Sequence, residues 1–174
     1  MHILVTGAAG MIGRKLLERL VKDGGLNGKA IDKLTLTDIV SPQAPKGLTS
    51  NVVLKTADLS APGIAEELVR DRPDVIFHLA AIPSGGSETD FEAGYRSNLD
   101  GTRNLLEAIR KTGDGYKPKV IYTSSIAVYG APFPHSIPDD FVLTPLTSYG
   151  AHKVMCETML ADYNRKGFLE GVGV

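Results

Sequence analysis

Short runs of apolar and β-branched residues alternate with longer amphipathic segments along this chain. Strands are expected at residues 2–6, 33–38, 52–55, 74–79, 119–124 and 171–174, and helices at 11–22, 61–70, 91–111 and 148–166. Because strands and helices take turns, consecutive strands must run parallel and the helices must cover both faces of the sheet. The pattern therefore predicts an α/β fold built on one doubly wound parallel sheet.

The spacing of apolar residues predicts which side of each helix is buried. These residues are Ile12, Leu16, Leu17 and Leu20 in the helix 11–22, and Leu99, Leu105, Leu106 and Ile109 in the helix 91–111. The nearly all-apolar run 74–79 suits a central parallel strand, which is covered on both faces. Proline, glycine and serine in the stretch 41–51 indicate an exposed loop.

Composition limits the classes of function. With 43% hydrophobic and 22% charged residues, the 174-residue chain fits one globular domain with a sizeable core. A net charge of -1 gives no electrostatic reason to expect nucleic acid or an anionic membrane as a partner. The single cysteine, Cys156, excludes an internal disulfide, and no Cys/His cluster has the spacing of a metal site. Neither a signal peptide nor a membrane-length apolar run is present, so the expected compartment is the cytoplasm.

A glycine-rich turn lies between the first expected strand and the first expected helix. Gly7, Gly10 and Gly13 allow a tight turn, a close approach of backbone to a pyrophosphate, and close contact of helix with strand. The start of the helix adds free N–H groups and a partial positive charge. This GxxGxxG spacing is one residue wider than GxGxxG, and a flexible turn is the alternative. Its position between strand and helix favours a Rossmann-like nucleotide site.

Acidic residues follow the second and third expected strands. Asp38 can accept hydrogen bonds from both hydroxyls of an adenosine ribose, and no Arg or Lys follows it at 39–41 to bind a 2′-phosphate. NAD is therefore expected rather than NADP, although a solvated aspartate would fit the same position. Asp58 and Leu59 are expected to meet the adenine, and the small residues at 79–81 let backbone run beside the cofactor. His78 is expected to be a core histidine without a catalytic role.

Tyr149 and Lys153 lie four residues apart in the last expected helix, so they share one face of it. An ammonium near a phenol favours the phenolate form, which makes Tyr149 a candidate acid or base near neutral pH. A long helix can carry this pair by chance, and the pair gains weight only from the motifs before it.

Together these motifs resemble those of the extended short-chain dehydrogenase/reductase family, also called the NAD-dependent epimerase/dehydratase family. The matching positions are 6–13, Asp38, Asp58-Leu59, 78–81, Asn98 within 97–102, the run 124–130 and Tyr149-x-x-x-Lys153. Every motif stands in the expected order along the whole chain. The stretches 2–20 and 163–171 look most like members that oxidise the 2-hydroxyl of a four-carbon sugar acid.

The resemblance implies an NAD-dependent enzyme with a Ser-Tyr-Lys site. The catalytic residues would be Tyr149 as base, Lys153 beside it and on the nicotinamide ribose, and Ser125 on the reacting oxygen. Asn98 would hold a water near the site, with a buried helix kink as the alternative. NAD would contact Gly7, Gly10, Met11, Ile12, Gly13, Asp38, Asp58, Leu59, Leu79, Ala80, Ala81, Asn98, Ser124, Tyr149 and Lys153. The sugar-acid substrate would contact Ser84, Ser125 and Tyr149. Ser84 lies in an expected loop at 82–90, where Ser87 could also bind hydroxyls and Gly85-Gly86 suggest mobility.

Two features depart from the family pattern. Members usually carry a further C-terminal substrate domain, so residues 1–174 are expected to be the NAD-binding part of a longer enzyme. Ile126-Ala127 replaces the Asp-Glu pair of the dehydratases, so dehydration is not expected. A dehydrogenase acting on a small sugar acid is the first hypothesis, a sugar or nucleotide-sugar epimerase the second, and a non-catalytic dinucleotide sensor the third. A homodimer is expected to pack through the helices 91–111 and 148–166.

Overall fold

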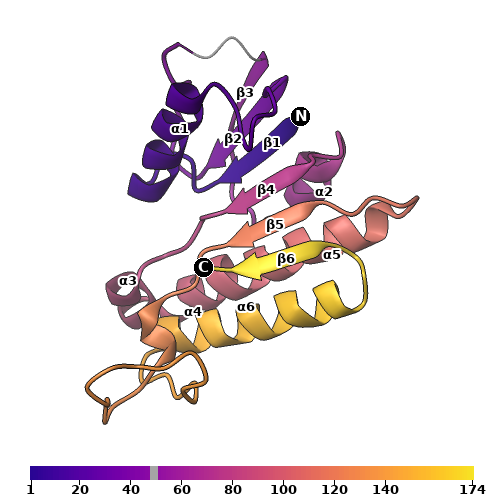
Figure 1. The fold of residues 1–174 in the computed structure, drawn as a ribbon. Helices are drawn as coiled ribbons and strands as arrows, with labels where there is room; N and C mark the ends of the chain where they lie inside the picture. The colour runs from indigo at the N-terminus through magenta and orange to yellow at the C-terminus, as the bar shows by residue number, and fades with distance from the viewer. Residues whose placement is uncertain (48–50) are drawn as a thin grey trace.

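The computed structural model describes residues 1–47 and 51–174, and its centre is a six-stranded parallel sheet (Figure 1). The strands are β1 (His2–Thr6), β2 (Lys33–Asp38), β3 (Asn51–Thr56), β4 (Val75–His78), β5 (Lys119–Tyr122) and β6 (Glu170–Gly173). They lie in the order β3-β2-β1-β4-β5-β6, and every neighbouring pair is parallel. The predicted doubly wound α/β fold is confirmed. Of the expected loop 41–51, residues 48–50 lie outside the described part.

The α-helices are α1 (Met11–Asp23), α2 (Ile64–Val69), α3 (Ser84–Thr89), α4 (Phe91–Gly94), α5 (Gly101–Thr112) and α6 (Ser148–Arg165). A π-helical segment, Tyr95–Asp100, joins α4 to α5, and a short 3₁₀ turn, Ile126–Val128, follows β5. The predicted helices at 11–22, 61–70 and 148–166 are confirmed, with shifted ends.

The expectation of a loop at 82–90 is wrong, because this segment contains α3. The expected helix 91–111 is helical throughout, and its stretch Tyr95–Asp100 is π-helical. The sequence Ser-Gly-Gly-Ser-Glu-Thr of α3 has no apolar periodicity, so contacts with the rest of the fold must stabilise this helix. One such contact is at Gly94, where an added Cβ would lie 3.0 Å from the Cβ of Ser87.

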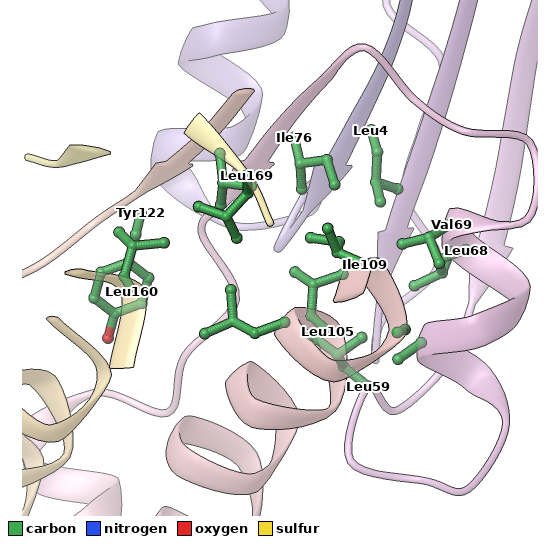
Figure 2. Close-up of a cluster of buried hydrophobic side chains, with 14 of the residues drawn as sticks. Leu4, Leu59, Leu68, Val69, Ile76, Leu105, Ile109, Tyr122, Leu160 and Leu169 are labelled. Carbon is green, nitrogen blue, oxygen red and sulfur yellow. The ribbon is translucent and has the colours of Figure 1, made fainter. Parts of the chain in front are cut away.

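Alternate residues of the strands feed two cores, one on each face of the sheet. On one face, Leu4 and Ile76 pack with residues of α2, α5 and α6, as Figure 2 shows for this cluster. On the other face, Ile3, Val5 and Leu34 pack with α1. Leu105, Leu106 and Ile109 are buried as expected, and Leu99 packs against the same core while partly buried.

The predicted buried side of α1 is only partly right. Leu17 and Leu20 are buried and Leu16 is partly buried, but Ile12 is 54% exposed. In the first turn of α1 only Gly13 is buried, and the apolar core is contacted by Leu16, Leu17 and Leu20 of the later turns. Among the residues that the structure describes, no helix is both long and apolar enough to cross a bilayer.

Candidate active site

A cleft of about 320 Å³ opens at the carboxyl ends of β1, β2, β3 and β4. It is lined by Thr6, Gly7, Ala9, Gly10, Thr37, Asp38, Ile39, Val40, Ala57, Asp58, Leu59, Leu79, Ala80, Ala81, Ile82 and Ser97. Most of the residues predicted from strand ends meet here. The cleft therefore lies where a doubly wound sheet binds its ligands.

The glycine turn is closed by backbone atoms. Gly7 has a positive φ of 73°, and an added Cβ on it would lie 2.6 Å from the amide nitrogen of Ala80. An added Cβ on Gly13 would lie 2.4 Å from the carbonyl oxygen of Gly7. Gly13 therefore packs behind the turn, and the wider spacing still gives a tight one. Met11 and Ile12 begin α1 as exposed residues outside the lining.

The Asp38 carboxylate is fixed beside this turn. Its Oδ2 accepts a hydrogen bond from the Ala9 N–H at 2.9 Å, and its Oδ1 accepts one from the Val40 N–H at 3.2 Å. The carboxylate thus joins the end of β2 to the glycine turn. Asp58 is fixed in a different way, because its Oδ1 accepts from both the N–H and the hydroxyl of Ser60.

His78 is a buried structural link. Its Nδ1 lies 2.7 Å from the Thr6 hydroxyl, and its Nε2 lies 2.9 Å from the Thr102 hydroxyl. Since Thr102 donates to the Asn98 carbonyl, it accepts from Nε2–H, and Nδ1 accepts from Thr6. Burial lowers the pKa of His78 to about 3, so the ring is neutral. The predicted core histidine with satisfied hydrogen bonds is confirmed.

Asn98 lies in the π-helical segment, is buried, and does not line the cleft. Its Oδ1 accepts from the Ile82 N–H at 2.7 Å, and its Nδ2 donates to the Ile82 carbonyl at 3.0 Å. Nδ2 also lies 3.2 Å from the Ser87 hydroxyl and 3.3 Å from Nδ1 of His152. Asn98 therefore holds the backbone of Ile82, a residue of the cleft, from a π-helical segment of the helix.

Lys153 and Tyr149 come together as predicted from their spacing. Lys153 is 2% exposed, and its Nζ donates to the Thr123 carbonyl at 2.6 Å. The same nitrogen lies 4.6 Å from the centroid of the Tyr122 ring and 5.5 Å from that of the Tyr149 ring. Burial lowers the pKa of Lys153 to about 8, so the amine remains mostly protonated at neutral pH.

The two predicted serines follow β5. Ser125 caps the 3₁₀ turn, where its Oγ accepts from the Ala127 N–H at 3.1 Å. Ser124 has a buried hydroxyl without a hydrogen-bond partner among the described residues. An added Cβ on Gly150 would lie 2.1 Å from the Ala127 carbonyl oxygen. The turn after Ser125 is therefore in close contact with the first turn of α6, next to Tyr149.

Eight cleft residues are absent from the predicted contacts, namely Thr6, Ala9, Thr37, Ile39, Val40, Ala57, Ile82 and Ser97. Ile39 and Val40 directly follow Asp38, so their position after a strand end was a usable signal. Ser97 reaches the cleft from the π-helical segment, which had no signal in the sequence. Ser84, the predicted substrate residue, begins α3 and is partly exposed.

The chain is similar to known proteins over nearly its full length. It is 43% identical to a D-erythronate dehydrogenase of Cupriavidus necator, covering 98% of this chain and 53% of that protein. A crystal structure of a nucleoside-diphosphate-sugar epimerase from Agrobacterium tumefaciens is 62% identical, with a TM-score of 0.98, covering 99% of this chain and 51% of that one. The chain thus spans about half the length of these relatives.

A third relative is a structure of UDP-glucose 4-epimerase from Brucella ovis in complex with NAD. It is 29% identical with a TM-score of 0.80, and the match covers 99% of this chain and 50% of that one. The family model for the NAD dependent epimerase/dehydratase family matches residues 3–174. Fold, motif order and the family model agree, and we conclude that the chain belongs to the NAD dependent epimerase/dehydratase family.

Proposed function

We propose that residues 1–174 are the NAD-binding part of a dehydrogenase that oxidises a secondary hydroxyl of a small sugar acid. The hydroxyl at C2 of D-erythronate or a similar acid is the proposed target. The observation that supports this proposal is the contact between the turn after Ser125 and the first turn of α6, together with the 5.5 Å between the Lys153 ammonium and the centroid of the Tyr149 ring. The similarity to a D-erythronate dehydrogenase supports the choice of substrate.

The cleft suits the shape and chemistry of NAD. Its glycine turn has no room for a Cβ at Gly7 or Gly13, so the turn is tight, and the N–H groups at the start of α1 would meet a pyrophosphate. The fixed Asp38 carboxylate has lone pairs left for ribose hydroxyls and would repel a 2′-phosphate. Buried hydroxyls of Thr37, a cleft residue, and of Ser124 find no partner within the described residues, and a bound ligand would supply one.

The other proposed NAD contacts keep the roles assigned from the family pattern. Asp58 and Leu59 would meet the adenine, and the backbone of 79–81 would run beside the cofactor. Met11 and Ile12 would contribute through the backbone at the start of α1. Asn98 would act through the Ile82 backbone that it holds.

The side chains of the site can divide the work of alcohol oxidation. Bound NAD supplies the acceptor for the hydride. Tyr149 would remove the proton of the substrate hydroxyl as general base, with the ammonium of Lys153 5.5 Å from the centroid of its ring. Ser125 would orient the reacting oxygen. Because its Oγ already accepts from the Ala127 N–H, its own hydroxyl hydrogen is free to donate to that oxygen.

A sugar or nucleotide-sugar epimerase is the alternative, and the similarity to the UDP-glucose 4-epimerase structure supports it. An epimerase would use the same Tyr149 and Lys153 but would retain the reduced cofactor. A dehydrogenase releases NADH. Dehydration is not proposed, since Ile126 and Ala127 provide neither an acid nor a base.

The deciding experiment is an assay of the full-length protein with a panel of four- to six-carbon sugar acids, read as NADH absorbance. Tyr149→Phe should lower turnover at least about 10²-fold, because a general base contributes about 10²- to 10⁴-fold. The affinity for NAD, measured by titration calorimetry, should stay the same. Unchanged turnover in Tyr149→Phe would refute the assigned base, and turnover without net NADH would favour the epimerase.

We also propose that the full-length protein is a cytoplasmic homodimer. The partners would pack through the segment from α4 to α5 and through α6. Val154, Met155 and Met159 of α6 are only partly buried in the single chain, which supports a second packing face on this helix.

A further inference from the structure

The short helix α3 is held at its start by the π-helical segment. Asn98 pairs with both backbone groups of Ile82, and the Ser87 hydroxyl donates to the Ile82 carbonyl at 3.3 Å. An added Cβ on Gly86 would lie 2.7 Å from Cγ2 of Ile82, so the helix packs closely on that side chain. Since Ile82 lines the cleft, the start of α3 is attached to the nucleotide site.

The other end of α3 is attached to the helix that carries the proposed base. Oε1 of Glu88 accepts a hydrogen bond from the N–H of Ser148 at 2.7 Å. Ser148 is the first residue of α6 and directly precedes Tyr149. The first N–H groups of a helix have no partner within it, and here Glu88 satisfies one while the Thr147 hydroxyl accepts from the Gly150 N–H at 3.0 Å. A carboxylate at this end also interacts favourably with the helix dipole.

Figure 1 shows α3 beside the N-terminal end of α6, with α4 close by. Helix α3 thus spans the distance between the nucleotide cleft and the first turn of α6. We propose that Glu88 is a positioning residue that holds α3 on the first turn of α6 and so fixes the Tyr149 phenol against the substrate hydroxyl. This rests on the proposed function, in which Tyr149 is the base. Glu88 itself touches no reacting atom.

A positioning role for Glu88 has measurable consequences that a purely stabilising role would not have. Its effect should fall on kcat, since misplacing a reacting group by about 1 Å can cost up to about 10²-fold in rate. The dissociation constant for NAD should not change, because the glycine turn and Asp38 are held by other contacts. The carboxylate acts as a hydrogen-bond acceptor, so a glutamine, whose carbonyl oxygen can accept from the same N–H, should replace it.

The test compares Glu88→Ala and Glu88→Gln with a control, Glu92→Ala, in the full-length protein. Glu92 is an exposed glutamate on the neighbouring α4, so its loss removes the same charge nearby. We expect kcat to fall about tenfold in Glu88→Ala, to recover within about twofold in Glu88→Gln, and to be unchanged in the control. An unchanged kcat in Glu88→Ala, an equal loss in Glu88→Gln, or an equal loss in Glu92→Ala would each overturn the proposal.

Hydrogen exchange of the α3 amides provides a readout that needs no substrate. Exchange should become faster in Glu88→Ala, but not in Glu88→Gln, because only the alanine variant releases the end of the helix. Equal exchange in Glu88→Ala and the wild type would overturn the proposal even if no sugar acid is oxidised. A wild type that reduces no NAD while Glu88→Ala exchanges faster would refute the proposed function alone and leave the attachment of α3 supported.

Discussion

The nucleotide half of the site, at β1 to β3, differs from the catalytic half, at β5 and α6, in what closes it. Around the glycine turn the neighbours are backbone atoms that leave no room for a Cβ. In the catalytic half, the Lys153 ammonium lies near the Tyr149 ring, and the turn after Ser125 contacts the first turn of α6. Apolar side chains in this half are exposed. Ile126, for example, is 84% exposed. We therefore expect the nucleotide half to determine the affinity for NAD and the catalytic half to determine turnover.

The largest expected effect is in the catalytic half. Lys153→Met keeps an unbranched side chain one atom shorter but removes the ammonium near Tyr149, so turnover should fall about 10²-fold or more. NAD affinity should fall far less, because the glycine turn is untouched. Steady-state kinetics and titration calorimetry on the same full-length preparation measure both. A loss of affinity as large as the loss of turnover would break the division between the two halves.

A smaller effect of the opposite kind is expected in the nucleotide half. In Gly13→Ala the added Cβ meets the Gly7 carbonyl, and such overpacking costs about 1–3 kcal/mol. If the turn shifts to relieve this contact, NAD affinity should fall about 5- to 150-fold. The control is Gly173→Ala in β6, where the nearest side-chain atom outside the chain neighbours is 3.9 Å away. Equal affinity in Gly13→Ala and the control would contradict the role of the turn.

The smallest effect concerns His78, at the end of β4, which lies between the two halves in the sheet. Its pKa is about 3 in the folded protein, below the usual value of about 6.5, so the unfolded chain binds a proton first as the pH falls. The contribution of neutral His78 to the free energy of unfolding is therefore present above about pH 6.5 and is lost progressively as the pH falls below that value. Between about pH 7 and about pH 5.5, His78 should account for about 1 kcal/mol of lost unfolding free energy.

Urea unfolding of the wild type and of His78→Gln at both pH values measures this contribution. The glutamine cannot titrate, so the pH-dependent loss should be about 1 kcal/mol smaller in the variant, whatever its absolute stability. The other histidines are present in both proteins and cancel in the comparison. The same pH dependence in both proteins would show that His78 is not neutral in the fold.

The residues at strand ends were predictable because the chain itself places them there. Gly7 directly follows β1, Asp38 ends β2 and Leu59 lies shortly after β3, and a parallel sheet gathers its carboxyl ends along one edge. Ser97 and Glu88 were not predicted as site residues. Their positions depend on the π-helical segment and on α3, whose backbone is held by contacts from distant segments. Ile12 was misplaced because periodicity gives the buried side of a helix but not where the core ends.

By itself the sequence determined the doubly wound sheet, the glycine turn and the Tyr149–Lys153 pair, because strand pattern, glycine spacing and helix periodicity are local properties of the chain. Only the tertiary structure decided that Asn98 holds Ile82, that Glu88 meets Ser148, and that His78 links two strands and a helix. These contacts join residues far apart in the chain, and a buried polar group takes whichever partner the packing brings near.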